Sequence, residues 1–341
     1  MDRLNAKIKL SFINGLRELV LSELKKYKDL NIAKEDDDFI YLNLPKNISE
    51  IKKLRSISKA YITSKNIKYN PLYISKHKSI LGELIEILLK EDKNSFKSFK
   101  IICSGKSSSE IRSISRYIQE NYNIPEKEDA DMKIHIIKAN NIWEIGIQIT
   151  PRPLSLRDYK VLNMEGAMDP TIAYAVNSLC DLDNSKSYLN IFSGSATLLI
   201  EAGLSYPDLK KLIGFDVNKK HISLAIQNIK KSGLLKNIQI KKEDIFDSPD
   251  LGKFDVITSD LPFGMSISKN EDLEKLYLCF IKYCQNTLNK DGILVVYTTK
   301  HEILRNIIEK SNFEMIKTLD LKLITSVNSY IYPKIFLCKQ E

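Results

Sequence analysis

The chain has 341 residues, of which 43% are hydrophobic and 28% charged, and these proportions are close to those of globular proteins. A chain of this length is longer than one that folds around a single ordinary core, and it is typical of two compact domains. No apolar stretch could span a bilayer, and the N-terminus lacks the apolar core of a signal peptide, so we expect no membrane association. The five cysteines include no CxxC pair and the four histidines have no metal-ligand spacing. We therefore expect a reducing, cytoplasmic location and no bound metal.

The net charge of +9 is concentrated in the first half of the chain. Residues 1–150 contain 27 Lys and Arg against 20 Asp and Glu, and residues 51–100 alone contain 12 against 4. Such a segment attracts phosphate backbones, although solvated surface lysines explain the count equally well. The distribution permits nucleic-acid binding without establishing it.

The first half alternates short strands with amphipathic helices. Strands are predicted at 7–12, 39–42, 60–67, 99–104, 132–138 and 142–150. Helices are predicted at 16–27, 48–55, 79–90 and 108–121. The last two strands alternate apolar and polar residues around Asn140-Asn141, which predicts a hairpin.

Two prolines, Pro151 and Pro153, interrupt regular structure and predict a linker. The second half then alternates strand and helix. Strands are predicted at 188–192, 212–216, 238–241, 254–258 and 293–298, with helices at 196–204, 219–232, 273–288 and 303–310. This order predicts an α/β fold with a doubly wound parallel sheet. Two final strands, 313–319 and 330–337, lack a helix between them and should pair antiparallel, which favours a seven-stranded methyltransferase over a dinucleotide-binding domain.

Three motifs follow successive strands of this second half. Asn190-Ile-Phe-Ser-Gly-Ser-Ala-Thr197 provides small residues that let a ligand approach the backbone at a helix N-terminus. Asp216 ends the next strand, where a carboxylate accepts hydrogen bonds from a ribose, and Asp244 follows the third strand, where it could receive an adenine amino group. Each motif has an alternative interpretation. The 190–197 segment could be a tight turn without a ligand, Asp216 could belong to a helix cap, and Asp244 could be a solvated surface acid.

The fourth motif, Ser259-Asp-Leu-Pro-Phe-Gly264, closes the fourth strand and indicates methylation of an exocyclic amine. The N2 lone pair of guanine is delocalised, so the amine must be oriented before it can attack. The Asp260 carboxylate and the Leu261 carbonyl can each accept one N–H, Pro262 fixes the turn, and Phe263 offers a face on which an extruded base stacks. An ordinary Pro-Phe corner is the alternative.

These motifs, in this order, resemble those of Rossmann-fold amino methyltransferases, whose fourth motif reads [DN]-x-P-[FY]. Upstream, Leu156–Tyr159 and Glu165–Asp169 resemble the segment that joins a THUMP RNA-binding domain to that catalytic domain. The chain is thus similar to the THUMP-containing tRNA guanine-N2 methyltransferases, and its DLPFG spelling is nearer to the guanosine-6 than to the guanosine-10 enzymes. The resemblance implies a ferredoxin-like subdomain at 1–55, a THUMP domain at 56–150, a linker at 151–168 and a Rossmann-like methyltransferase domain at 169–341.

The expected function is transfer of a methyl group from S-adenosylmethionine to N2 of a guanosine in tRNA. Catalysis is assigned to Asp260, Leu261, Pro262 and Phe263. Cofactor binding is assigned to Ala167, Asn190, Phe192, Gly194, Ser195, Thr197, Asp216, Val217, Asp244, Ile245 and Asp260. RNA binding is assigned to Lys100, Lys106, Arg112, Arg116 and Arg157. We expect a monomer, and leave open a small activating protein partner.

The first motif departs from the family pattern D-x-F-C-G-S-G-T at Asn190 and Ala196, which puts cofactor affinity in question. Four alternatives stay open: another RNA guanine (guanosine-10 of tRNA or a ribosomal site), adenine N6 in DNA, an RNA-binding scaffold with a weak methyltransferase domain, and an NAD enzyme.

Overall fold

A computed structural model describes residues 6–36, 38–66, 78–103, 109–139, 142–161, 164, 166–262, 270–326 and 328–340. The chain divides into two compact units: Met1–Phe12 with Val20–Ser155, and Ile13–Leu19 with Leu156–Glu341. Among the described residues, no helix has the length and apolar character needed to cross a membrane.

The first unit is built on one seven-stranded sheet in the order β2-β3-β1-β4-β7-β6-β5. Its strands are β1 (Lys7–Ser11), β2 (Ile32–Glu35), β3 (Phe39–Asn43), β4 (Lys59–Asn66), β5 (Phe99–Cys103), β6 (Met132–Ala139) and β7 (Ile142–Gln148). Its helices are α2 (Lys78–Asp92), α3 (Ser109–Tyr122), and the short 3-10 turns η1 (Ile48–Lys53) and η3 (Lys93–Ser95). The strands on both sides of residue 55 therefore belong to a single sheet.

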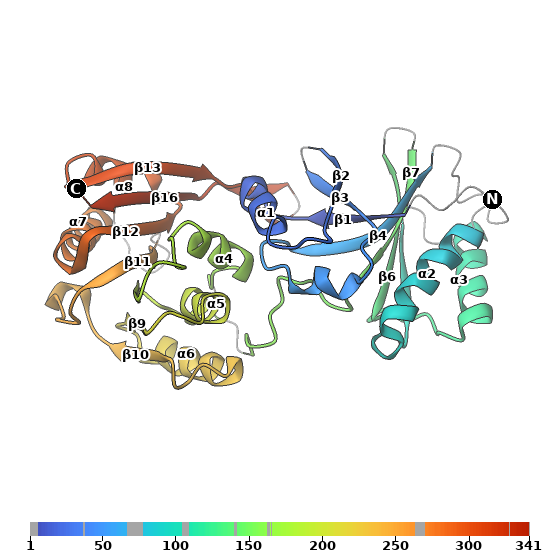
Figure 1. Ribbon diagram of the computed structural model, residues 1–341, viewed down its shortest axis with the longest axis horizontal. Coiled ribbons are helices and arrows are strands. Elements are labelled where there is room, and N and C mark those ends of the chain that lie inside the picture. The colour runs from blue at the N-terminus through green and yellow to red at the C-terminus, as the bar shows by residue number, and fades with distance from the viewer. Residues whose placement is uncertain are drawn as a thin grey trace. The chain divides into compact units, whose positions relative to one another are not determined.

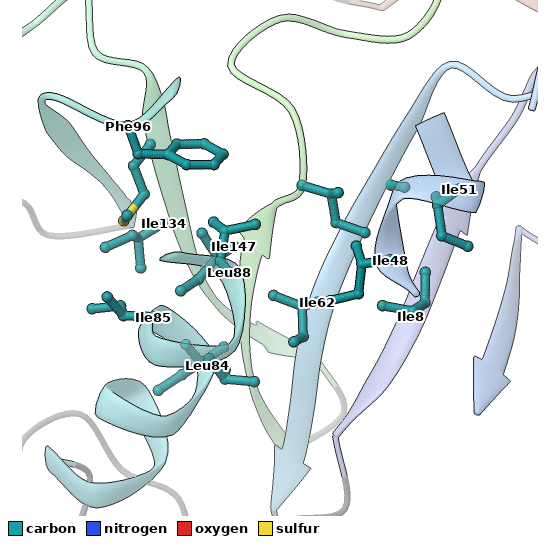
Figure 2. Packing of buried hydrophobic residues seen from close by; sticks show 14 of the residues in the cluster. Ile8, Ile48, Ile51, Ile62, Leu84, Ile85, Leu88, Phe96, Ile134 and Ile147 are labelled. Carbon is teal, nitrogen blue, oxygen red and sulfur yellow. The ribbon is translucent and has the colours of Figure 1, made fainter. Parts of the chain in front are cut away.

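One face of this sheet carries the core of the first unit. Alternate strand residues such as Ile8, Ile62 and Ile147 are buried, as the period of two in a strand requires. Figure 2 shows Ile48 and Leu84, from η1 and α2, on the same side of the sheet as these residues. Helix α2 contacts β4 and β7, and side chains of both α2 and α3 belong to the same apolar cluster (Figure 1).

The second unit contains a seven-stranded sheet in the order β10-β9-β8-β11-β12-β16-β13, as expected for a Rossmann-like methyltransferase. Its strands are β8 (Ser187–Ile191), β9 (Lys211–Asp216), β10 (Ile238–Lys242), β11 (Phe254–Asp260), β12 (Leu288–Thr298), β13 (Phe313–Asp320) and β16 (Lys334–Gln340). The five strands β8 to β12 are parallel, and β16 pairs antiparallel with both β12 and β13.

Helices cover both faces of the second sheet, which explains the continuously apolar strands. The helices are α4 (Pro170–Ser178), α5 (Thr197–Ser205), α6 (Lys219–Ser232), α7 (Asn270–Thr287) and α8 (His301–Ile308). Residues of α4, α5 and α6 form one apolar cluster with the sheet, and residues of α7 and α8 form another (Figure 1).

Several elements of the structure were not predicted from the sequence pattern, the 3-10 turn η3 among them. Strand β2 is four residues long and lies at a sheet edge, and α4 begins where the linker was expected to end. The hairpin of β14 (Leu323–Ser326) and β15 (Ser329–Ile331) separates β13 from β16. The predicted helix at 48–55 is the 3-10 turn η1, capped by the side chain of Asn47. The turn predicted at Asn140-Asn141 lies outside the described residues.

Residues Ile13–Leu19, which include the first residues of α1 (Arg17–Leu24), belong to the second unit although they lie between the two segments of the first. Leu16 is fully buried in the cluster formed with α4 and α5. Asn14 forms a β-bridge with Lys322, and Glu18 is ion-paired with Lys317 at 2.7 Å. The second unit is therefore complete only with this N-terminal segment.

Replacing Leu16 with Ala should lower the free energy of unfolding of the second unit by about 2–4 kcal/mol, because it leaves a cavity in a closed core. Hydrogen exchange should then become faster at the backbone amides of β13 and β16. The half-exposed Leu204 provides the control, since Leu204→Ala should change little. Faster exchange confined to the first sheet would contradict the assignment of this segment.

Candidate active site

The turn between β8 and α5 holds three residues in the left-handed region of backbone space. Phe192 has φ of 57°, Gly194 of 52° and Ala196 of 63°. This conformation costs a residue with a Cβ about 1–2 kcal/mol, and such outliers cluster at functional sites. Ala196 stands where the family pattern has glycine, so the departure noted in the sequence falls on a strained position.

Buried hydrogen bonds stabilise this turn. The Ser193 hydroxyl lies 3.0 Å from both the Asn190 and Phe215 carbonyls, and Asn228 donates its side-chain N–H to the Ser195 carbonyl. The hydroxyls of Ser195 and Thr197 are 3.1 Å apart, and both residues are buried. Ser195 and Thr197, predicted to bind the cofactor, thus also hold the turn in shape.

Asp216 links this turn to the start of α6. Its Oδ2 accepts the Gly194 N–H at 3.0 Å and its Oδ1 accepts the Asn218 N–H at 2.8 Å. His221 Nδ1 lies 3.3 Å from the carboxylate. The neighbouring Val217 is 56% exposed, so it presents an apolar surface beside the carboxylate. The structure brings Gly194, Asp216 and Val217 together, as the sequence predicted.

The third strand ends at Asp244, which is half-buried. Its Oδ1 accepts the Phe246 N–H at 3.0 Å and so caps the short 3-10 turn η4 (Ile245–Asp247). Ile245 is buried. Strands β9 and β10 are parallel, and Asp216 lies opposite Lys242. Asp244 comes two residues after Lys242, so it lies at the same edge of the sheet as Asp216.

Two acceptor atoms on neighbouring strands lack donors. Asn190 is buried and donates its side-chain N–H to the Thr258 carbonyl at 3.1 Å, but its Oδ1 has no hydrogen-bond partner. Oδ1 of Asp260 is also buried and accepts no hydrogen bond from the described residues, although part of the residue's surface remains accessible. A buried acceptor without a donor is destabilising, and in native structures it often marks a place for a ligand.

The loop after Asp260 is held by strand β12 and helix α7. The Leu261 N–H donates to the Tyr297 carbonyl at 3.0 Å, and Leu261 is buried. The Tyr277 hydroxyl donates to the Pro262 carbonyl at 2.9 Å and also lies 3.0 Å from the Thr298 hydroxyl. The Asp260-Leu261-Pro262 loop is thus fixed from two sides, whereas Phe263 lies outside the described residues.

Burial raises the pKa of Asp260 to about 7, and the ammonium of Lys160 opposes that rise. Lys160 itself is half-buried, and its Nζ donates to the Met168 carbonyl at 2.8 Å. Burial likewise raises the pKa of Tyr277 to about 12 and raises that of Tyr297, and the charge of Asp260 adds to both shifts. Asp260 therefore titrates near neutrality. Among the described residues, the charge that favours its ionised form is the ammonium of Lys160, which lies in the linker.

The linker is attached to α5 through Glu201, which is fully buried. Arg157 Nε lies 3.2 Å from Glu201 Oε1, and the Tyr159 hydroxyl donates to the same oxygen at 2.7 Å. The Arg157 side chain is only 10% exposed, so it stabilises the linker, and its assignment to RNA stays a prediction. The predicted cofactor residue Ala167 is half-buried and donates its N–H to the Met164 carbonyl.

The remaining residues predicted to bind RNA lie in the first unit. Arg112 and Arg116 are exposed and one turn apart on α3. Lys100 is ion-paired with Glu128, and Lys106 lies outside the described residues. Among the described members of this predicted set, Arg112 and Arg116 are consequently the most accessible.

The residues present fit S-adenosylmethionine, the cofactor expected from the sequence. The two buried acceptors on Asn190 and Asp260 suit the N–H donors of an ammonium or an amine. A Cβ placed on Gly194 would lie 3.0 Å from the terminal methyl of Met164, which can move, so the positive φ of 52° is the stronger reason for glycine here. The described residues contain no cluster of His, Cys, Asp and Glu that could hold a metal.

Sequence reasoning missed Lys160, Tyr277 and Tyr297. Each contacts or influences the fourth motif from a distant part of the chain, and none belongs to a motif. Lys160 directly follows the segment Leu156–Tyr159 quoted for the family resemblance, and this position was the available signal for it.

Comparisons with known proteins agree with this geometry. Residues 157–324 match the family UPF0020, described as the RMKL-like methyltransferase domain. A tRNA (guanine(6)-N2)-methyltransferase of Archaeoglobus fulgidus is 23% identical over 54% of this chain and 53% of its own length. The U6 snRNA (guanine-N(2))-methyltransferase THUMPD2 of mouse is 28% identical over 48% of this chain and 29% of its own length. The matched region thus spans about half of the archaeal relative and less than a third of the mouse relative.

Solved structures share the fold over nearly the whole chain. TrmN from Thermus thermophilus superposes with a TM-score of 0.77 at 19% identity, covering 98% of this chain and 100% of that one. SMU.472, a methyltransferase solved in complex with SAH, gives a TM-score of 0.71 at 15% identity, covering 98% of each chain. At these identities the structural likeness shows the fold, and the sequence match shows an RMKL-like methyltransferase domain over residues 157–324, just under half of the chain.

Proposed function

We propose that the protein transfers a methyl group from S-adenosylmethionine to the exocyclic N2 of a guanosine in tRNA, with guanosine 6 of the acceptor stem as the favoured target. One observation carries the proposal. Oδ1 of Asp260, at the end of β11, is buried and accepts no hydrogen bond from the described residues. It is the acceptor that an amine substrate with two N–H donors requires.

The names of the relatives support this substrate class. The Archaeoglobus fulgidus relative is named for guanine 6 of tRNA and the mouse relative for a guanine in U6 snRNA, so both names specify guanine N2. We favour guanosine 6 because the DLPFG spelling resembles that group. The monomeric state and cytoplasmic location expected from the sequence are part of the same proposal.

The chemistry of the site follows from its acceptors. S-adenosylmethionine, when bound, supplies a methyl group on a positively charged sulfur. Asp260 accepts one N–H of the amine and the Leu261 carbonyl accepts the other, which turns the nitrogen lone pair out of the plane of the base. Tyr277 hydrogen-bonds the Pro262 carbonyl, and this bond keeps the neighbouring peptide groups in one orientation. Phe263 is proposed to stack on the base.

Asp260 also provides a place for the proton that the nitrogen loses. A base is most effective when its pKa lies near the working pH, and burial brings Asp260 to about 7. The Lys160 ammonium, fixed on the Met168 carbonyl, lowers the cost of the carboxylate form. Lys160 is therefore a positioning residue that keeps a fraction of Asp260 ionised.

The cofactor is proposed to bind along the strand ends. Gly194 and Ala167 allow close approach, while Asp216 receives the ribose hydroxyls next to the exposed face of Val217. Asp244 and the Ile245 N–H are proposed to recognise the adenine. Because Asp216 already binds the Gly194 N–H, its carboxylate couples the shape of the turn to the ribose position.

In the first unit, Arg112 and Arg116 are proposed to contact phosphates, together with Lys100 and Lys106. Their exposure on one helix face supports this role. Such contacts would hold the RNA without reading its sequence.

Replacing Asp260 with Asn should lower the rate of single-turnover methyl transfer to unmodified tRNA by about a hundred- to thousandfold, because the amine loses a charged acceptor. Cofactor affinity, measured by calorimetry, should fall far less than the rate, because the proposed ribose acceptor Asp216 is unchanged. Asp247 is an exposed carboxylate in η4, and Asp247→Asn is the matched control. A wild-type rate in Asp260→Asn would show that the fourth motif is only a structural corner.

The same variant should alter stability in a pH-dependent way. An unperturbed aspartate titrates near 3.8 and folded Asp260 near 7, so between these values the folded state holds the extra proton. The free energy of unfolding therefore falls as the pH rises from 4 to 7. At pH 8 the Asp260→Asn variant should be more stable than wild type by about 1–3 kcal/mol, and at pH 4 the two should be equal. Equal thermal unfolding at both pH values would contradict the buried charge.

Replacing Arg112 and Arg116 together with Ala should weaken tRNA binding and reduce the slope of log affinity against log salt by about 2. Filter binding at several salt concentrations measures both quantities. Lys290 and Lys310 are exposed near the amino ends of β12 and β13, at the end of the second sheet remote from the four motifs, so their double Ala variant is the control. An unchanged slope in the arginine variant would contradict the proposal that α3 contacts RNA phosphates.

A further inference from the structure

The hairpin β14–β15 leaves the second sheet beside the proposed catalytic carboxylate. Asp260 pairs with Tyr297 on β12, and Tyr297 pairs with Ile335 on β16. Adjacent strands are about 4.8 Å apart, so Ile335 lies about 10 Å from Asp260. Asp320, which ends β13, pairs with Lys334 on the other side of β16. The chain between these residues, 321–333, therefore emerges at the active-site edge.

The base of this hairpin is firmly attached. Leu321 is buried in the core of the second unit, and its N–H donates to the Pro333 carbonyl at 2.9 Å. Lys322 forms the β-bridge with Asn14 described above, and Lys334 is ion-paired with Asp320 at 2.9 Å. The hairpin thus projects from a fixed position.

Its outer residues are apolar or aromatic and yet exposed. Ile324 is 77% exposed, Tyr332 57% and Tyr330 42%, and Ile331 is exposed as well. Each would stabilise the fold more if it were buried, at roughly 25 cal/mol for every Å² of apolar surface. A group of exposed apolar side chains beside a functional site is typical of an interaction surface.

The charge of the segment indicates the kind of partner. Residues 321–333 contain the cation Lys322 and no acidic residue, and Lys334 just beyond them is paired with Asp320. The Lys322 ammonium lies 4.3 Å from the centroid of the Tyr330 ring. Aromatic faces combined with cations and without acids are the features that bind unstacked nucleobases and their phosphates.

We propose that the β14–β15 hairpin binds the RNA strand next to the target nucleotide, with Tyr330 and Tyr332 stacking on bases that flank the extruded guanosine. This inference rests on the proposed function, since it takes RNA as the substrate. An extruded base leaves its neighbours unstacked, and an aromatic surface beside the pocket compensates for part of that loss.

The test uses the full chain and unmodified tRNA transcript without cofactor. Tyr330→Ala/Tyr332→Ala should weaken tRNA binding by roughly five- to a hundredfold with an unchanged salt dependence, because stacking neutralises no phosphate. Tyr330→Phe/Tyr332→Phe should bind like wild type, since the ring faces remain. Leu235 is exposed after α6, and Leu235→Ala is the control for loss of exposed apolar surface. Thermal unfolding should be the same in all variants, since every substituted residue is exposed.

Three results would overturn the inference: wild-type affinity in the double Ala variant, an equal loss in the double Phe variant, or self-association that the double Ala variant abolishes. Methyl transfer distinguishes this failure from failure of the proposed function. If wild type and the double Ala variant bind and methylate tRNA equally, only the role of the hairpin is wrong. If wild type transfers no methyl group to guanine N2, the proposed function is wrong, whatever the hairpin variants show.

Discussion

The parallel pairing of β8 with β9 and β11 is the constraint on which the site depends. Because these strands run in one direction, the turns that follow them open on one edge of the sheet. The Asp216 carboxylate then lies 3.0 Å from the Gly194 N–H, although 22 residues separate them. Asp260 ends the strand on the other side of β8. A single pattern of backbone hydrogen bonds thus positions four motifs.

This arrangement places costs on the fold. Two residues with a Cβ, Phe192 and Ala196, adopt left-handed backbone conformations in the β8–α5 turn. Two buried oxygens, on Asn190 and Asp260, lack donors, and a carboxylate is held where burial opposes its charge. The large apolar clusters on both faces of the sheet offset these costs. Strained backbone and unpaired buried acceptors at the ends of neighbouring strands are typical of a binding site.

The sequence predicted the features that depend on local pattern. Helix α6 has the predicted bounds, 219–232, because Asn218 caps its start and Gly233 ends it in a left-handed conformation. The antiparallel edge of β13 and β16 followed from the missing helix between them, although the inserted hairpin was not foreseen. The motif residues were identified from their position after each apolar strand. The comparisons confirm the methyltransferase family of the second half, and the domain bounds and residue roles stay predictions.

Features that depend on distant residues were not visible in the sequence. Lys160 influences Asp260 only because Arg157 and Tyr159 attach the linker to Glu201 on α5. The Tyr277 hydroxyl donates to the Pro262 carbonyl from the middle of α7. The apolar pattern of that helix predicts Tyr277 only as a buried core residue. Leu16 joins the second unit from the opposite end of the chain. No local pattern encodes such contacts, because they arise from the packing of the whole unit.

The central claim is that this site methylates the exocyclic amine of a guanosine in tRNA. Transfer of a labelled methyl group to unmodified tRNA transcripts, followed by nucleoside analysis, tests it most directly. We expect the label in N2-methylguanosine, and its loss from a transcript in which guanosine 6 is replaced. Label in a methylated adenosine, or no transfer by a protein that binds both cofactor and tRNA, would contradict the account.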